Sequence, residues 1–231
     1  MDVAADWLAP TWFLDSDAEE VGDFARSAVG TAQGPVDRAI ALFHAVRDGI
    51  RYDPYHISYE REAFRASSVV RSPTNWCVPK SVLLAASARH LGIPARLGFA
   101  DVRNHLTSEK LSATMGTDLF AWHGYAELLL PDPAGTDGDV RWFKLSTAFN
   151  IELCERFGVK ALEFDGTDDA LMHPYDQAGN RHMEYVRQRG SFDDLPFDQI
   201  LRDFAEIYGS WFGDIEHAGS AEAAGDDAFA G

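Results

Sequence analysis

Residues 74–96 read TNWCVPKSVLLAASARHLGIPAR, and this stretch decides the fold that we expect for the chain. Four apolar residues recur at helical spacing after Cys77: Val82, Leu83, Ala86 and Leu91. Gly92 follows them, and glycine is the residue type that most often ends a helix. Residues 93–99 then have the pattern of a strand. The stretch therefore predicts a helix that begins at a cysteine and leads directly into a β-sheet.

The sequence after this stretch predicts the rest of the sheet. Residues 121–130 and 140–145 are strand candidates, and the segment between them is rich in Pro, Gly and Asp, which favours a β-hairpin. Three further elements are expected downstream: a helix over 150–157, a short strand over 159–164 and a last helix over 196–212.

The sequence before residue 74 has a mainly helical pattern. The expected elements are an extended segment over 1–16, a helix capped by Ser16 or Asp17 that ends near Gly30, a helix from Pro35 to about Gly49, and a long connection over 52–76. N-terminal helices, followed by a cysteine-bearing helix packed on a mostly antiparallel sheet, define an α+β fold.

Composition limits the partners of the protein. Of the 231 residues, 46% are hydrophobic and 12% aromatic, which is enough for one large core. Lys and Arg number 20 and Asp and Glu 37, so the formal net charge is 20 − 37 = −17. An acidic chain repels phosphate backbones and anionic lipids, so we expect no nucleic-acid partner and no membrane partner. We expect one domain over 1–213 and a disordered acidic tail over 214–231.

The sequence also predicts the cellular compartment of the protein. No run approaches 18 uninterrupted apolar residues, and the N-terminus lacks the basic and apolar regions of a secretory signal. A domain of this size needs no disulfide, so we expect Cys77 and Cys154 to be free thiols in a reducing cytoplasm.

Several common catalytic motifs are missing from the sequence. It contains no G-x-S-x-G, G-x-G-x-x-G, Walker A or H-E-x-x-H motif. It has no C-x-x-C pair, and its eight histidines lack ligand spacing, so we expect neither a metal nor another cofactor.

Cys77 is the first candidate for chemistry. The unpaired N–H groups and partial positive charge at a helix N-terminus favour thiolate over thiol, which predicts a lowered pKa. The same N–H groups can hold an oxyanion during acyl transfer. The alternative is that Cys77 is a small buried apolar residue, which is the commoner role of a lone cysteine.

His123 is the second candidate. It lies in residues 120–128, which read FAWHGYAEL, and Gly124 beside it leaves room for close approach. A neutral imidazole near a low-pKa thiol forms a nucleophile and its base. The alternative is a histidine on a half-solvated face of the strand.

Three blocks in order resemble the transglutaminase-like superfamily of papain-like thiol enzymes. They are the cysteine helix that ends in LGIPAR, the strand WHGYAE at 122–127 and the strand RWFKL at 141–145. The resemblance covers residues 35–150, and the Gly-Ile-Pro-Ala-Arg run is its most specific part. It implies a papain-like transglutaminase core.

The resemblance also implies a Cys–His–Asp triad, with Cys77 as nucleophile and His123 as base and later acid. The third member should follow Trp142 by four residues, where this sequence has Ser146. A serine hydroxyl can accept a hydrogen bond from the ring but carries no charge to stabilise an imidazolium. Asn150 is an alternative orienting residue, as asparagine is in papain-type enzymes.

Four other residues are weaker candidates. Asn75 or Trp76 can assist the oxyanion or cover the thiol, and Tyr52 resembles a segment near the cleft in relatives. His105 follows the first predicted strand and can face the site. For each of the four, a role as a surface-loop or core residue is the favoured alternative.

The function expected from these residues is that of a cytoplasmic thiol enzyme acting on a small-molecule or peptide amide. Cys77 attacks an amide or ester carbonyl, and water or an amine resolves the thioester. Cleavage is favoured over protein cross-linking, because the chain lacks the extra domains of the large cross-linking enzymes. The alternative, favoured by Ser146, is a binding or scaffold module that kept the fold and lost the chemistry.

Overall fold

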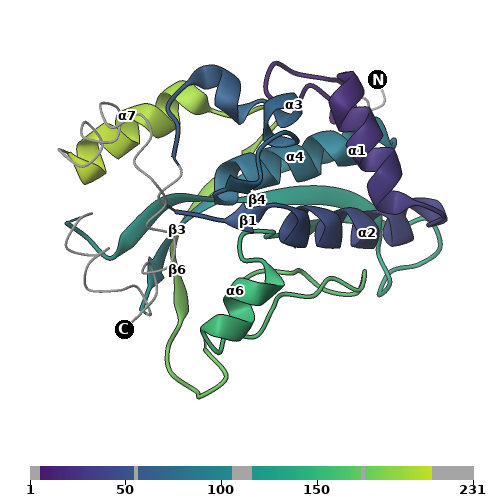
Figure 1. The fold of residues 1–231 in the computed structure, drawn as a ribbon. Coiled ribbons are helices and arrows are strands. Elements are labelled where there is room, and N and C mark those ends of the chain that lie inside the picture. Colours follow the sequence, from purple (N-terminus) through teal and green to yellow (C-terminus); the bar gives the residue numbers. More distant parts are fainter. Residues whose placement is uncertain (1–5, 55–56, 106–115, 173–174, 210–231) are drawn as a thin grey trace.

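The computed structural model describes residues 6–54, 57–105, 116–172 and 175–209. Its main sheet has the strand order β5-β4-β3-β6, and every neighbouring pair is antiparallel (Figure 1). The bounds are Ala95–Asn104 for β3, Leu119–Pro131 for β4, Val140–Leu145 for β5 and Met183–Phe192 for β6. Helices pack on this sheet, so the predicted α+β class and the β4–β5 hairpin are confirmed.

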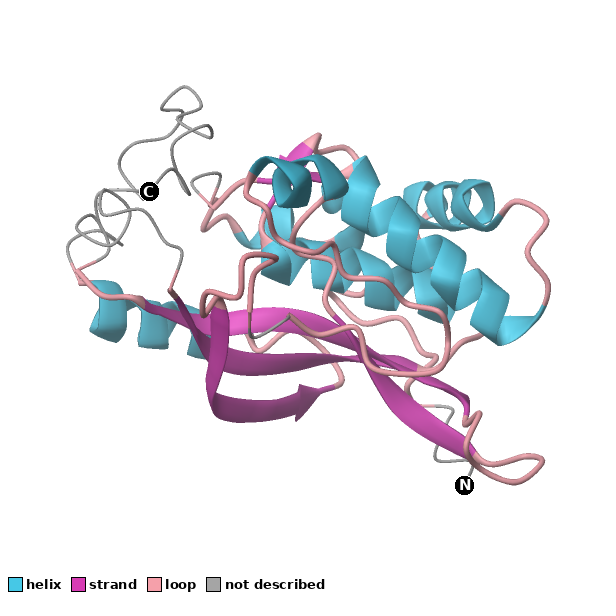
Figure 2. Ribbon diagram, turned by 90° about the horizontal axis from the view of Figure 1, so that it is seen from below, coloured by secondary structure: helices cyan, strands magenta, loops and turns pink. Residues whose placement is uncertain are grey.

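The central element is α4 (Cys77–His90), which begins at the predicted cysteine. Its residues from Cys77 to Arg89 are buried on every side of the helix. It contacts β3 and β4 below it, and on its other sides α1 (Glu19–Val29), α2 (Gly34–Gly49) and α3 (Ala66–Val69). Figure 2 shows most of the helices on one side of the sheet. Burial all round explains why this helix is rich in Ala, Val and Leu.

The two N-terminal helices lie where the sequence predicts them. α1 ends at Gly30, whose positive φ suits glycine, and Pro35 lies in the first turn of α2. The predicted caps of α1 are wrong by a residue or two. Ala18 holds the N-cap position and no side chain caps the helix.

The long connection predicted over 52–76 contains more structure than expected. It includes a 3₁₀ helix, η1 (Arg61–Phe64), and the short helix α3. Its ends form a small parallel sheet of β1 (Arg51–Tyr52) and β2 (Thr74–Asn75). This pairing brings Tyr52 beside the segment that leads into Cys77.

Downstream, one predicted strand is wrong and one strand was not predicted. Residues 159–164 form no strand; they bury Val159, Leu162 and Phe164 while their chain runs outside any sheet. The edge strand β6 was not predicted, because half of its residues are exposed and its sequence lacks an apolar alternation.

The remaining helices are α6 (Ile151–Arg156) and α7 (Phe197–Tyr208). Both lie inside predicted helices, but residues 210–231, including the predicted tail over 214–231, lie outside the described residues. One hydrophobic core extends from Phe13 to Tyr208. None of the helices in the described ranges has the length and apolar character of a bilayer span.

Candidate active site

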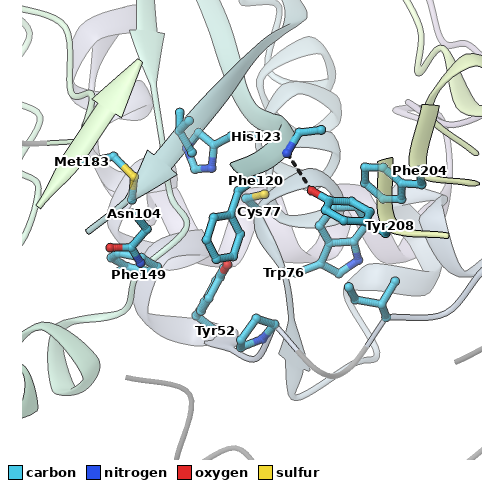
Figure 3. Close-up of a pocket in the computed structure, with 14 residues that line it drawn as sticks. Tyr52, Trp76, Cys77, Asn104, Phe120, His123, Phe149, Met183, Phe204 and Tyr208 are labelled. Carbon is cyan, nitrogen blue, oxygen red and sulfur yellow. Dashed lines mark hydrogen bonds between the residues drawn. The ribbon is translucent and has the colours of Figure 1, made fainter. Parts of the chain in front are cut away.

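A cleft opens at the N-terminal end of α4, and Cys77 and His123 both line it (Figure 3). Its described lining is mostly aromatic and aliphatic. The aromatic residues are Tyr52, Trp76, Phe120, Phe149, Phe204 and Tyr208. The other lining residues are Pro54, Ile57, Cys77, Val102, Asn104, Ala121, His123 and Met183. Segments that are far apart in the sequence, from Tyr52 to Tyr208, therefore meet around the thiol.

Cys77 lies at the start of a helix, as predicted, but its pKa differs from the prediction. Its sulfur accepts hydrogen bonds from backbone N–H groups, including those of Val78 and Gly124, which favour the thiolate. The thiol is buried, however, and the loss of water outweighs these bonds. Burial raises the pKa of Cys77 to about 11. The sequence-based expectation of a lowered pKa is therefore wrong, because the cleft around the helix terminus is apolar.

His123, in β4, is also deeply buried, with only 6% of its surface exposed. Burial lowers the pKa of His123 to about 4, because the charged imidazolium loses its hydration. Both pKa shifts favour neutral groups. At neutral pH the resting site thus holds a thiol and an imidazole, not an ion pair.

Ser146 is the residue that the structure brings to the imidazole. It directly follows β5, and its Oγ lies 3.3 Å from His123 Nε2. Asn150, the alternative orienting residue, has its side chain bonded elsewhere. Its Oδ1 accepts from the backbone N–H of Tyr52 at 3.0 Å, and its Nδ2 donates to Glu152. Asn150 therefore joins β1 to the start of α6.

The weaker candidates separate into two groups. Trp76 and Tyr52 line the cleft. The Asn75 side chain instead accepts from the backbone N–H of Trp76 at 3.1 Å, and His105 lies 3.2 Å from a carboxylate oxygen of Glu184. In the described part of the chain, no three His, Cys, Asp or Glu side chains are grouped closely enough to hold a metal ion.

A β-bulge lies immediately before His123. The register between β3 and β4 shifts between Ala100 and Val102, and opposite this point Trp122 has a φ of +58°. This conformation is strained for a bulky residue, and bulges re-aim the side chains next to them. Both N–H groups of the bulge are satisfied by side chains: Ala121 donates to the Tyr208 hydroxyl at 2.7 Å and Trp122 to Asp101 at 3.0 Å.

A buried ionic cluster holds this bulge in place. Arg189 of β6 donates to Asp101 and Asp203, and its guanidinium lies 4.5 Å from the Trp122 ring centroid. The indole N–H of Trp122 also donates to Asp203 at 2.9 Å. The sequence did not predict a role for these residues. No local signal links them, because their relation arises only when β3, β6 and α7 meet.

Lys80 is a second residue that the sequence analysis did not single out. It is fully buried one turn after Cys77, and its ammonium donates to the carbonyl oxygens of Arg47, Ile50 and Ala148 at 2.9, 2.5 and 3.0 Å. Burial lowers the pKa of Lys80 to about 7. The hydrogen bonds act in the opposite direction, because the three carbonyl acceptors match the three N–H donors of the charged form. Lys80 thus ties the end of α2 and the loop after β5 to the first turn of α4. The signal in the sequence is that Lys80 is the one charged residue of this helix before Arg89.

Gly124 is required for the close approach of β4 and α4. A Cβ atom at this position would lie 3.1 Å from Val78 Cα and 3.2 Å from Val78 Cγ2. We expect Gly124→Ala to lower the free energy of unfolding by about 1–3 kcal/mol. The added methyl group would press against the backbone of Val78, in the first turn of α4, and backbone cannot move aside as a side chain can. Urea unfolding measures this change. Gly49→Ala is the matched control, since its Cβ would meet no atom within 4 Å, and equal stability of the two variants would contradict the prediction.

Comparisons with known proteins agree with this fold. Residues 22–147 match the family model of the transglutaminase-like superfamily, and the chain belongs to this superfamily. No curated protein matches the sequence.

Seven solved chains match the structure. One is a protein from Cytophaga hutchinsonii described as a candidate cysteine protease, with a TM-score of 0.50 and 14% identity. The match covers 84% of this chain and 48% of that one, so this chain spans about half the length of its structural relative. At this identity the likeness supports the shared fold alone.

Proposed function

We propose that the protein is a thiol enzyme that hydrolyses or transfers the acyl group of an amide or peptide-like substrate. Cys77 is the nucleophile, His123 the general base and acid, and Ser146 the residue that orients the imidazole. The observation that carries the proposal is that Cys77 at a helix N-terminus and a Ser146-bonded His123 line one cleft.

In this mechanism the resting groups are neutral, so proton transfer accompanies attack. His123 Nε2–H donates to Ser146 Oγ, which leaves Nδ1 to take the thiol proton as the sulfur–carbon bond forms. Backbone N–H groups at the start of α4 stabilise the oxyanion. His123 then protonates the leaving amine, and water or a second amine, deprotonated by His123, releases the acyl group from Cys77.

The alternative function is a binding module that retains the fold. Two observations favour it: Ser146 supplies no negative charge to His123, and burial raises the pKa of Cys77 to about 11. In either case we propose a cytoplasmic protein, because both cysteines are free thiols. We also propose that nucleic acids and membranes are not its partners, given the net charge of −17.

Alkylation by iodoacetamide from pH 5 to 9 tests the proposal, with Cys77 and Cys154 counted separately by peptide mass spectrometry. Cys154 is a well-matched internal control: it is buried, and burial raises its pKa to about 11 as well. We expect Cys77 to react faster than Cys154 in the wild type, because only Cys77 shares a cleft with an imidazole. His123→Ala should abolish this difference.

A result in which Cys77 reacts no faster than Cys154 would favour the binding module. If Cys77 is faster, substrate screening follows with Cys77→Ala as the inactive control. Turnover that survives Cys77→Ala would exclude the thiol mechanism.

A further inference from the structure

Two aromatic walls flank Cys77 (Figure 3). On one side Tyr52 and Phe149 meet edge to face with ring centroids 4.9 Å apart. On the other side Phe204 lies between Trp76 and Tyr208, at centroid distances of 6.0 and 5.2 Å. These rings line the cleft that contains the sulfur.

The cleft side of this aromatic surface is open to a ligand. Tyr52, Phe120 and Phe149 all line the cleft and are only partly buried. Water against these rings is released when an apolar group replaces it, which favours binding of apolar surface. Aromatic rings in a ligand gain further from edge-to-face contacts.

Charged groups find no counterpart among the described residues of this cleft. None of its described lining residues is Asp, Glu, Lys or Arg. Lys80 lies close in the sequence, but it is buried beneath the site and its ammonium is bonded to three carbonyl oxygens. The Tyr208 hydroxyl accepts from Ala121 and donates to the carbonyl of Leu119. A charged ligand would therefore lose water without gaining an ionic partner.

We propose that the acyl donor of this enzyme is an uncharged ester, thioester or amide that carries an aromatic ring close to its reacting carbonyl. The inference rests on the proposed function and adds the substrate class. The ring lies between the two aromatic walls, and the reacting carbonyl, its only strongly polar part, lies at Cys77 and the helix N-terminus.

Three probes that share the same reactive chloroacetamide group and differ in their side group test this substrate class. The phenyl probe is N-(2-phenylethyl)chloroacetamide, the carboxylate probe is N-chloroacetyl-β-alanine and the ammonium probe is N-(2-aminoethyl)chloroacetamide. In each reaction the sulfur of Cys77 displaces chloride, the S–C bond forms as the C–Cl bond breaks, and the thiol proton passes to His123. Second-order rate constants are measured for Cys77 and Cys154 in the same sample.

We expect the phenyl probe to label Cys77 about 10- to 100-fold faster than either charged probe, which is the range that burial of one ring supplies. Labelling of Cys154 should differ little between probes. Equal or faster labelling of Cys77 by a charged probe would overturn the inference. Labelling of Cys77 that never exceeds that of Cys154 and does not depend on His123 would instead refute the proposed function, so the two failures are distinguishable.

A charge introduced into the cleft gives a second test. Ile57 lines the cleft from a loop and is only partly buried, so a polar side chain there is compatible with folding. We expect Ile57→Glu to raise labelling by the ammonium probe relative to the phenyl probe, whereas the uncharged control Ile57→Gln should not. An unchanged ratio in Ile57→Glu would show that the side group lies outside the cleft, which also overturns the inference.

Discussion

Replacing Ser146 by aspartate is expected to increase the rate of Cys77 alkylation at pH 7 by about 10- to 1000-fold, because a neighbouring carboxylate raises an imidazole pKa by about 1–3 units. The Ser146 hydroxyl lies 3.3 Å from His123 Nε2 and is 1% exposed, so water screens the new charge little. The imidazolium that the carboxylate stabilises in turn stabilises the thiolate of Cys77.

The pH dependence of this reaction should change in a defined direction. In the wild type the pKa of the Cys77 thiol is about 11, so the rate should rise throughout pH 5 to 9 without a plateau. In Ser146→Asp the pKa of His123 rises from about 4 and that of Cys77 falls. The rate should therefore level off between these two pKa values, inside the measured range.

Ser146→Asn is the matched control, because it has the shape of the aspartate without its charge. We expect it to leave the rate close to that of the wild type. Ser146→Ala, which removes the ring contact, should slow alkylation. An equal acceleration in Ser146→Asn, or a folded Ser146→Asp variant that reacts no faster than the wild type, would contradict the role given to Ser146.

Replacing Lys80 by methionine is expected to lower the free energy of unfolding by about 3–9 kcal/mol, because three buried carbonyls lose their donor and each costs about 1–3 kcal/mol. Methionine matches the length of the lysine side chain but donates no hydrogen bond. The carbonyls of Arg47, Ile50 and Ala148 would all lose the same partner. Such a loss is a large part of the stability of a single domain.

Urea unfolding measures the effect of Lys80→Met, with Lys160→Met as the control on an exposed lysine. Lys80→Gln keeps an N–H donor group and should fall between the two. If Lys80→Met is too unstable to isolate, the stability of Lys80→Gln still shows whether the three carbonyls depend on the Lys80 ammonium. Wild-type stability in either Lys80 variant would show that the three carbonyls do not depend on this ammonium.

Much of the site could be read from local sequence. The helix that starts at Cys77, the strand that carries His123 and the hairpin that ends before Ser146 all follow from periodicity and turn composition, which depend on neighbouring residues. The resemblance to the transglutaminase-like superfamily, and not a local pattern, pointed to Ser146 as the residue that lies against the imidazole. Strand β6 was not predicted, because this partly exposed edge strand has no apolar alternation in its sequence.

The sequence by itself determined which elements carry Cys77 and His123, and the family resemblance of the sequence pointed to Ser146 beside the imidazole. Only the tertiary structure decided their chemical state. Packing of α4 against the sheet removes water from Cys77 and His123 and makes both neutral. The bulge at Trp122 and the carbonyl partners of Lys80 likewise need segments that are remote in the chain. Desolvation and strand register depend on such neighbours, and no local pattern reports them.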